Sequence, residues 1–202
     1  MNSTPLLILG SNSPRRKEIL KEAGYHFSTM TLDIDENYPD SLPKKSIAQF
    51  LSEVKNKAYR QSLVDEVLIT ADTTVIVNDQ SLEKARNSKE AVAMLEKLSD
   101  SFHEVVTGYC ISNGQKTRSN FVKTTVHFKK LSRREIDHYI EVYQPFDKAG
   151  AYGIQEWIGM IGISKIEGSY FNVVGLPIFE ISEDLKKFGI DPYRSIKRKK
   201  SS

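Results

Sequence analysis

The chain has 202 residues, of which 39% are hydrophobic and 27% charged, with 11 glycines, 7 prolines and one cysteine. This composition excludes collagen-like and low-complexity chains, and the length fits one domain with a sizeable core. A single cysteine excludes an internal disulfide framework and a cysteine-rich zinc ribbon. No apolar run reaches the roughly 18 residues that span a bilayer, and no signal-peptide pattern opens the chain. We therefore expect a soluble, cytoplasmic protein with no membrane partner.

The positive charge of the chain lies in a tail. Residues 194–202 contain five basic residues and no acidic one. Since the whole chain carries +3 and the tail +5, residues 1–193 carry −2. We expect residues 1–193 to form one domain and residues 194–202 to form a disordered basic tail. A tail that binds nucleic acid or serves targeting is the alternative, although the negative charge of the body argues against a broad nucleic-acid surface.

Strand and helix patterns alternate in the first third of the chain. The apolar run Leu6–Leu9 predicts a buried strand. A serine–proline pair at 13–14 predicts the start of a helix that stops at Gly24. Residues 33–43 are acidic and rich in proline, which predicts a loop. Apolar residues at helical spacing from Ile47 to Ala58 predict a second helix.

The middle of the chain is dominated by strand patterns. Apolar triplets at 67–69 and 75–77 predict two strands that flank the segment 71–74. A helical spacing at 91–98 follows, and Asn113-Gly114 predicts a hairpin between two longer strands. In the second of these strands, ending near Lys130, apolar and polar residues alternate, so we expect one buried face and one solvated face.

The last third begins with a helix that Ser132 caps. A glycine-rich stretch at 150–175 follows, and Pro177 opens a final helix that ends near Gly189. There is no internal repeat. The mixture predicts an α/β fold built on a mixed, partly antiparallel sheet flanked by helices.

Two arginines at the start of the first helix point to an anion site. Arg15 and Arg16 lie in the first helical turn, where the macrodipole disfavours cations. Backbone N–H groups also point out of this turn, and a guanidinium group binds phosphate oxygens in a fork. The arrangement therefore fits a phosphate ligand, and it also fits two solvated arginines.

Acidic residues offer candidate metal ligands and a candidate base. Asp72 follows an apolar strand pattern, and its carboxylate can bind Mg²⁺ or accept a proton from water. Asp33, Asp35 and Glu36 form a second acidic cluster. Either group also fits a solvated turn or loop.

Three further side chains are candidates for binding a ligand. Lys57 lies at the border of the apolar stripe of its helix, and Lys84 follows a turn. Gln155, in a glycine-rich segment, offers both a hydrogen-bond donor and an acceptor. Each also fits an ordinary surface position. Cys110 lies in a strand pattern and is expected to be a buried structural thiol.

Short blocks in order from Leu6 to Leu185 resemble the Maf family of nucleoside triphosphate pyrophosphatases. The blocks are Ser11–Arg16, Ala71–Thr73, Leu82–Lys84, His103–Thr107, Asp147–Gln155, Glu167–Ser169 and Val173–Pro177. The resemblance implies an inosine-triphosphatase-like α/β fold with a central cleft, and often a homodimer. It also implies a cytoplasmic house-cleaning hydrolase that uses a divalent metal, Mg²⁺ or Mn²⁺, to cut a nucleoside triphosphate into monophosphate and pyrophosphate.

The block at 148–155 resembles the subgroup that acts on dTTP and UTP, whereas the subgroup for 7-methyl-GTP generally lacks its Ala-Tyr-Gly-Ile-Gln run. Position by position, Asp72 resembles the proton acceptor of the family. Arg15, Thr73 and Gln155 resemble its base-selecting residues. The phosphate- and metal-handling set corresponds to Ser11, Arg16, Glu36, Lys57 and Lys84, with Glu36 and Asp72 expected to hold the metal.

Two positions depart from the family pattern. Ala85 stands where the family usually has proline after the lysine, and Asp100 replaces a usual glycine before His103. Two other functions stay open at this point. One is hydrolysis of 7-methyl-GTP or of non-standard purine nucleotides, and the other is a non-catalytic role in regulating cell division.

Overall fold

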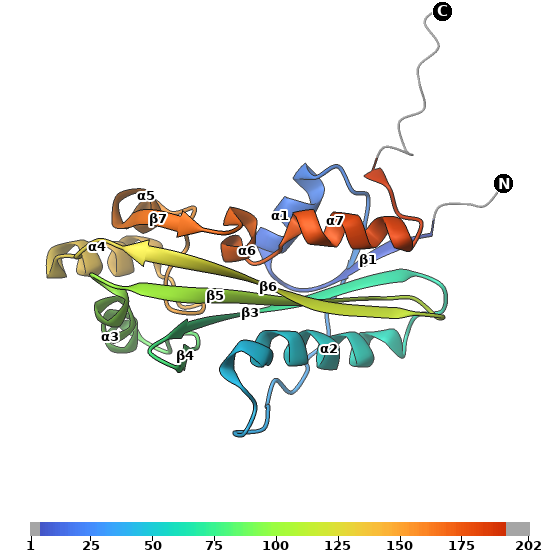
Figure 1. The fold of residues 1–202 in the computed structure, drawn as a ribbon, viewed down its shortest axis with the longest axis horizontal. Helices are drawn as coiled ribbons and strands as arrows, with labels where there is room; N and C mark the ends of the chain where they lie inside the picture. The colour runs from blue at the N-terminus through green and yellow to red at the C-terminus, as the bar shows by residue number, and fades with distance from the viewer. Residues whose placement is uncertain (1–4, 193–202) are drawn as a thin grey trace, which may run out of the picture.

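The computed structural model describes residues 5–192 (Figure 1). The basic tail predicted at 194–202 lies outside the described residues. The strands are β1 Leu7–Gly10, β2 Ser28–Met30, β3 Val67–Val77, β4 Gln80–Leu82, β5 Phe102–Ser112, β6 Thr117–Phe128 and β7 Ile163–Glu167. The helices are α1 Pro14–Glu22, α2 Ile47–Arg60, α3 Ser88–Leu98, α4 Arg133–Tyr143, α5 Trp157–Gly162, α6 Tyr170–Val174 and α7 Ile178–Lys187, with a 3-10 turn at Lys44–Ser46 before α2.

The strands form one mixed sheet in the order β2-β1-β3-β5-β6-β7, with β4 also paired to β3. The pairs β1–β2 and β1–β3 are parallel, and all the others are antiparallel. The long strands β3, β5 and β6 cross the molecule and set its elongated shape (Figure 1). The predicted mixed sheet flanked by helices is confirmed, and so is the hairpin at Asn113-Gly114, which joins β5 to β6.

Strand β3 is continuous, and the prediction of two strands flanking residues 71–74 is wrong. Pairing with β5 runs unbroken from Leu68 to Ile76 and holds the whole segment extended. Along its other edge, β3 pairs with β1 at 67–69 and with β4 at 75–77. In the part of the chain that the structure describes, no strand pairs with residues 70–74 on that edge. The polar break in the sequence therefore marks an open stretch of sheet edge, not a break in the strand.

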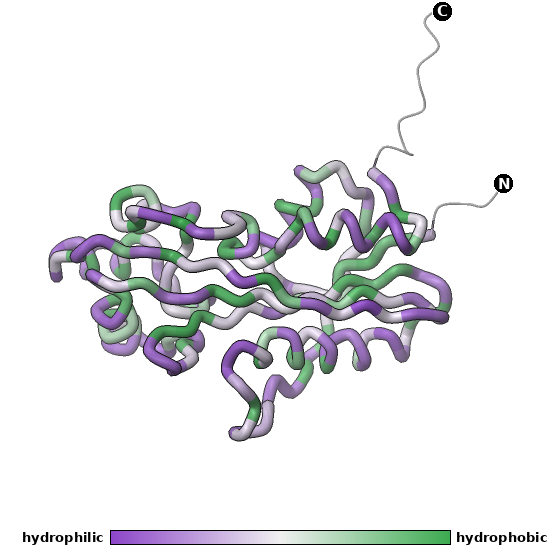
Figure 2. Tube along the Cα trace, in the orientation of Figure 1, coloured by the Kyte–Doolittle hydropathy of each residue, from purple (hydrophilic) through white to green (hydrophobic). Residues whose placement is uncertain are grey.

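Helices cover the two faces of the sheet in separate groups. Helix α2 packs on one face, while α1 and α7 lie on the opposite face toward one end of the molecule (Figure 1). One core cluster joins β1, α1, α7 and the first half of β3, and a second joins α3, α4, α5 and the second half of β3. Figure 2 shows apolar residues concentrated on the strands, with hydrophilic residues on the outer turns and loops. The open edge of β3 lies where the two clusters meet.

The expected helix signals are confirmed. Pro14 is the first residue of α1, and Ser132 and Glu135 form a capping box at the start of α4. The acidic segment 33–43 contains neither helix nor strand, as predicted.

Asp100 adopts a left-handed φ of 54°, which is the conformation that glycine favours. The departure from the family pattern at this position therefore affects a turn. Within the described residues, no helix is long and apolar enough to cross a membrane.

Candidate active site

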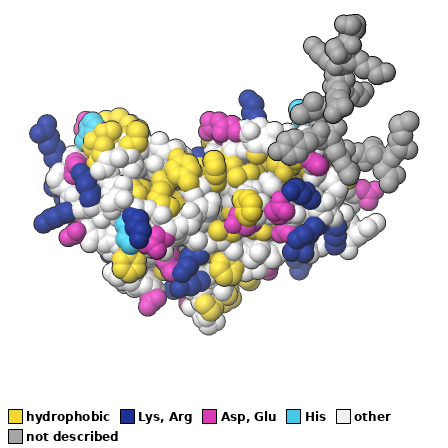
Figure 3. Space-filling model, turned by 45° about the horizontal axis from the view of Figure 1, so that its top comes forward, with side chains coloured by type: hydrophobic (Ala, Val, Ile, Leu, Met, Phe, Trp, Pro, Cys, Tyr) yellow, Lys and Arg dark blue, Asp and Glu magenta, His cyan; other side chains and the backbone are white. Residues whose placement is uncertain are grey.

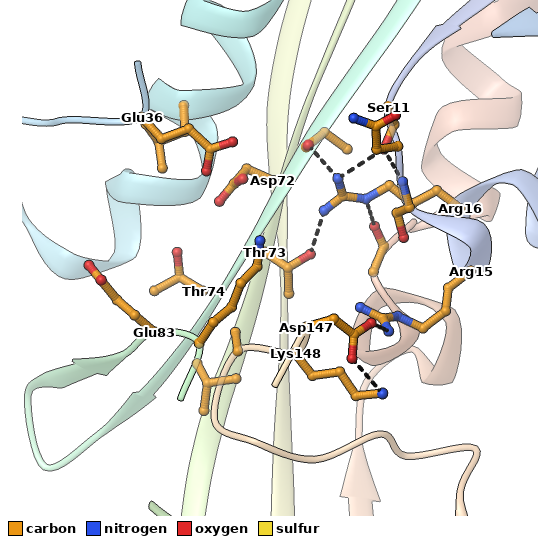
Figure 4. A pocket seen from close by; sticks show the side chains of 18 of the residues that line it. Ser11, Arg15, Arg16, Glu36, Asp72, Thr73, Thr74, Glu83, Asp147 and Lys148 are labelled. Carbon is orange, nitrogen blue, oxygen red and sulfur yellow. Dashed lines mark hydrogen bonds and ion pairs between the residues drawn. The ribbon is translucent and has the colours of Figure 1, made fainter. Parts of the chain in front are cut away.

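A cavity of about 510 Å³ opens beside the unpaired edge of β3. Its walls come from the β1–α1 turn, the 32–38 segment, α2, β3, the residues around the end of β4, the 147–155 loop and the end of α6. Figure 4 shows side chains from these separate segments pointing into one space. The residues predicted for the site that line it are Ser11, Arg15, Arg16, Glu36, Asp72, Thr73, Lys84 and Gln155.

Lys57 is the predicted site residue that the structure does not bring into the cavity. It is exposed on α2, and Lys55 lines the cavity instead. The reason is helical geometry, because residues four apart share one face of a helix. Ile47, Leu51, Lys55 and Tyr59 follow this spacing, and all four line the cavity. Lys57 is two residues further along than Lys55 and therefore faces away.

On one side of the cavity, the carboxylates of Asp72 and Glu36 pair with the ammonium group of Lys55. Alternate residues of a strand point to opposite faces, and Asp72 shares the face of Leu68 and Ile76, which pack against α2. Lys55 Nζ lies 2.6 Å from Asp72 Oδ1 and 3.0 Å from Glu36 Oε1. The Lys55 and Asp72 side chains are 13% and 14% exposed, so this pair is shielded from solvent. One ammonium group therefore holds two carboxylates at a single point.

A hydrogen bond links the segment that carries Glu36 to the residues that follow β4. Tyr38 Oη donates a hydrogen bond to Glu83 Oε1 at 3.1 Å. Burial raises the pKa of Tyr38 above its usual value; the hydrogen bond to Glu83 adds to this shift, and a contact with Ser81 opposes it. The phenol therefore stays a donor at neutral pH. This contact ties the loop to the residue next to Lys84.

Arg16 donates hydrogen bonds to the residues on both sides of Asp72 in β3. Its Nη1 donates to the Ala71 carbonyl at 2.7 Å and its Nη2 to Thr73 Oγ1 at 3.1 Å. Its Nε donates to the Gly175 carbonyl at 2.8 Å, and a longer contact of 3.5 Å reaches Ser11 Oγ. Burial lowers the pKa of Arg16, and the nearby Asp72 carboxylate opposes that shift. Figure 4 shows the guanidinium surrounded by these partners.

Arg15, the neighbouring arginine, faces the cavity and pairs with an acid. Its Nη1 lies 2.7 Å from Asp147 Oδ2, and Lys148 Nζ lies 2.7 Å from the other oxygen, Oδ1. Partial burial raises the pKa of Asp147, but hydrogen bonds from Lys148 and Arg15 outweigh it and hold the pKa below its usual range. Figure 4 shows Asp147 between the two cations.

The cavity suits an anionic ligand that carries several charges. Five cationic side chains and four carboxylates line it: Arg15, Arg16, Lys55, Lys84 and Lys148, with Glu36, Asp72, Glu83 and Asp147. The cations come from segments far apart in the sequence, and a phosphate group is the ligand that such a set binds best. On the face of the molecule that Figure 3 shows, charged side chains of both signs are interspersed and the described residues form no broad basic surface.

Sequence reasoning missed Lys55, Asp147 and Lys148. The spacing of four from Ile47 and Leu51 was the signal that identifies Lys55. Asp147 and Lys148 lie in the block 147–155, where the sequence prediction of a ligand site rests on the small residues and on Gln155. Asp147 pairs with Arg15 across 132 residues of sequence, and no local pattern indicates this contact.

Comparison with known proteins places the chain in a family. The family model described as "Maf-like protein" matches residues 6–188. A protein named dTTP/UTP pyrophosphatase from Cytophaga hutchinsonii is 46% identical over 181 residues, which cover 90% of this chain and 83% of that relative. A protein of the same name from Phocaeicola vulgatus is 48% identical over 183 residues, which cover 90% and 95%.

Among solved structures, the Staphylococcus aureus Ham1 protein is similar with a TM-score of 0.44 and 14% identity, covering 60% of this chain and 71% of that one. The family assignment comes from the sequence matches. They span both core clusters and every segment that lines the cavity. The chain belongs to the Maf-like protein family.

Proposed function

We propose that the protein is a nucleoside triphosphate pyrophosphatase that converts dTTP and UTP to the monophosphate and pyrophosphate. The observation that carries this proposal is the shielded carboxylate of Asp72, which faces a cavity lined by cations from distant segments. The names of relatives 46% and 48% identical to the chain support the same activity and the same substrates.

Asp72 acts as the proton acceptor in this proposal. A water molecule attacks the α-phosphorus, its proton passes to the Asp72 carboxylate, and the bond between the α-phosphorus and the bridging oxygen breaks. The electron pair leaves with pyrophosphate. Lys55, which is bonded to Asp72, orients the carboxylate, and Lys84 neutralises part of the charge of the triphosphate. Groups held in place before the reaction stabilise the developing charge at little cost of rearrangement.

Arg16 keeps the base in place. Its bonds to the Ala71 carbonyl and the Thr73 hydroxyl fix the residues on either side of Asp72. Among the described residues, no strand pairs with the edge at 70–74, so this guanidinium supplies the Ala71 carbonyl with a donor that a neighbouring strand otherwise provides. We therefore assign Arg16 a positioning role in addition to its place in the wall of the cavity.

The carboxylates of Glu36 and Asp72 fit a divalent cation. Mg²⁺ is usually bound through one or two carboxylates together with phosphate oxygens of the substrate. Both side chains contact the same Lys55 ammonium, so they already share a cation-binding point. Within the described residues, no group of three or more acidic, histidine or cysteine side chains can hold a metal ion alone. Mg²⁺ or Mn²⁺ would therefore bind together with the nucleotide and would withdraw charge from its phosphoryl oxygens.

The donors at the cavity wall favour uracil and thymine. These bases present two carbonyl oxygens with an N–H between them, whereas cytosine presents one carbonyl oxygen and an amino group. Arg15 only donates hydrogen bonds, and the Gln155 amide donates and accepts. A donor-only group beside C4 of the ring favours the carbonyl oxygen of uracil or thymine over the amino group of cytosine. The family resemblance of Arg15, Thr73 and Gln155 supports the same assignment.

A hydrolysis panel tests the proposal. The enzyme is given dTTP, UTP, CTP, ATP, GTP, ITP and 7-methyl-GTP, with and without Mg²⁺, and phosphorus NMR identifies the products. The proposal predicts pyrophosphate and a monophosphate, with dTTP and UTP as the best substrates and a requirement for the metal. Release of orthophosphate, a preference for 7-methyl-GTP or ITP, or no turnover of any nucleotide would contradict it.

A further inference from the structure

The hydroxyl group of Tyr139 in α4 forms hydrogen bonds with the loop that carries Gln155. Gly153 N donates a hydrogen bond to Tyr139 Oη at 3.0 Å. Tyr139 Oη in turn donates to Glu156 Oε2. Gln155 therefore lies between two residues that are fixed to one phenol group.

Glu156 connects Tyr139 to the cations of the cavity. Lys148 Nζ lies 3.0 Å from Glu156 Oε1 and 2.7 Å from Asp147 Oδ1. The second oxygen of Asp147 pairs with Arg15. A continuous chain of contacts thus runs from Tyr139 through Glu156, Lys148 and Asp147 to Arg15.

Burial strengthens the contacts among Tyr139, Glu156 and Lys148. Tyr139 is fully buried, and the Lys148 and Glu156 side chains are only 10% and 19% exposed. Burial, reinforced by the hydrogen bond to Glu156, raises the pKa of Tyr139, so the phenol remains protonated and donates. Removing one partner of a shielded charge pair costs more than removing one from a surface pair.

The Glu156 side chain packs closely against the backbone at Gly153. A Cβ added at Gly153 would lie 2.8 Å from Glu156 Cδ and 3.1 Å from Lys148 Cε. The carboxylate therefore packs directly against the loop that precedes Gln155. The absence of a side chain at Gly153 leaves room for this close approach.

We propose that Glu156 and Tyr139 are positioning residues for base selection, a role that rests on the proposed hydrolysis of pyrimidine nucleotides. The contacts from Tyr139 to Arg15 hold the two base-facing side chains, Arg15 and Gln155, in one fixed relation. Loss of the Glu156 charge leaves Lys148 with Asp147 alone. Asp147 then pairs more strongly with Lys148 and more weakly with Arg15, which frees Arg15 to meet other bases.

Kinetics of conservative variants test this role. Glu156→Gln keeps the shape and an acceptor for Tyr139 but removes the charge, and Tyr139→Phe removes the hydroxyl that holds Gly153. For both we expect KM for UTP to rise roughly tenfold, and the preference in kcat/KM for UTP over CTP to fall by a similar factor, with kcat within about twofold of wild type. Glu141→Gln, the same chemical change at an exposed position of α4, is the matched control and should alter neither quantity.

A double-mutant cycle tests whether the contacts act as one chain. Asp147→Asn and Glu156→Gln change residues that both bind Lys148, so the double variant should lose less selectivity than the product of the two single losses. Independent, multiplicative losses would overturn the proposal, and so would an equal decrease for UTP and CTP in both Glu156→Gln and Tyr139→Phe. If the wild-type enzyme prefers another nucleotide, the proposed substrates are wrong, and the same ratio is then measured against that nucleotide.

Discussion

Replacing Arg16 by lysine separates a positioning role from a phosphate-binding role. Arg16 donates to the carbonyls of Ala71 and Gly175 and to Thr73 Oγ1 at 2.7, 2.8 and 3.1 Å. A lysine keeps the charge but has its three donors on one nitrogen, so it cannot reach all of these partners from one position. We expect at least two of the bonds to be lost.

The expected loss of stability follows from those bonds. Hydrogen bonds to charged groups contribute about 1.5–3 kcal/mol each, so losing two of them lowers the free energy of unfolding by about 3 kcal/mol or more. In a chain of this size, 1 kcal/mol corresponds to about 2–4 °C in Tm, so Tm should fall by about 6–12 °C. Calorimetry measures this shift. Because Ala71 and Thr73 flank the proposed base, kcat should fall roughly tenfold, while KM changes less.

Arg15→Lys is the matched control, with the same change one residue away. Arg15 pairs with Asp147, whose side chain is 57% exposed, and pairs at such partly exposed sites contribute about 1 kcal/mol or less to stability. This variant should keep Tm within about 3 °C of wild type and should raise KM. The reasoning is refuted if Arg16→Lys leaves Tm unchanged and raises KM at constant kcat.

Further variants test other residues of the site and the effect of a buried histidine on stability. Lys55→Met should lower kcat/KM by roughly 100-fold, whereas Lys57→Met should leave it unchanged, since only Lys55 contacts Asp72; steady-state kinetics decide. Glu36→Gln should raise the Mg²⁺ concentration for half-maximal activity by roughly tenfold, measured by metal titration after chelation; an unchanged titration would remove Glu36 from the metal site. His103 is buried with its pKa lowered to about 3, because burial and then His127 disfavour its charge. The unfolded chain therefore binds the extra proton below pH 6.5, so stability is lost as pH falls from 6.5 toward 3, by about 2 kcal/mol between pH 7 and 5. His103→Gln should lack that loss in urea unfolding at the two pH values, and equal losses would refute the assignment.

The sequence predicts this fold well because its signals are local. The proline at position 14, the capping serine at 132 and the Asn-Gly pair at 113–114 each determine a turn or a helix start through chemistry that lies within four residues. The interpretation of residues 71–74 fails for a different reason. A polar interruption breaks the apolar pattern, but β5 pairs across it and keeps the strand extended. Pairing between distant segments is not visible in a local pattern.

The site was predictable where a residue belongs to a compact block. Asp72, Arg15 and Gln155 each lie in such a block, and all three line the cavity. The prediction of Lys57 rests on a looser local match, and Lys55, two residues earlier on α2, lines the cavity because a shift of two residues turns a helical side chain away. Asp147, which pairs with Arg15, lies 132 residues further along the chain, and only the fold brings the two side chains together. The homodimer and the cytoplasmic location stay predictions.

Turnover of dTTP by the Asp72→Asn variant tests the central claim most directly. Asparagine keeps the shape of the side chain but cannot accept the proton from water. With saturating Mg²⁺ and phosphorus NMR as the readout, the wild-type enzyme should form dTMP and pyrophosphate. The variant should form the same products at least about 100-fold more slowly, with KM within about threefold. A turnover close to that of the wild type would contradict the assignment of Asp72 as the base in this cavity.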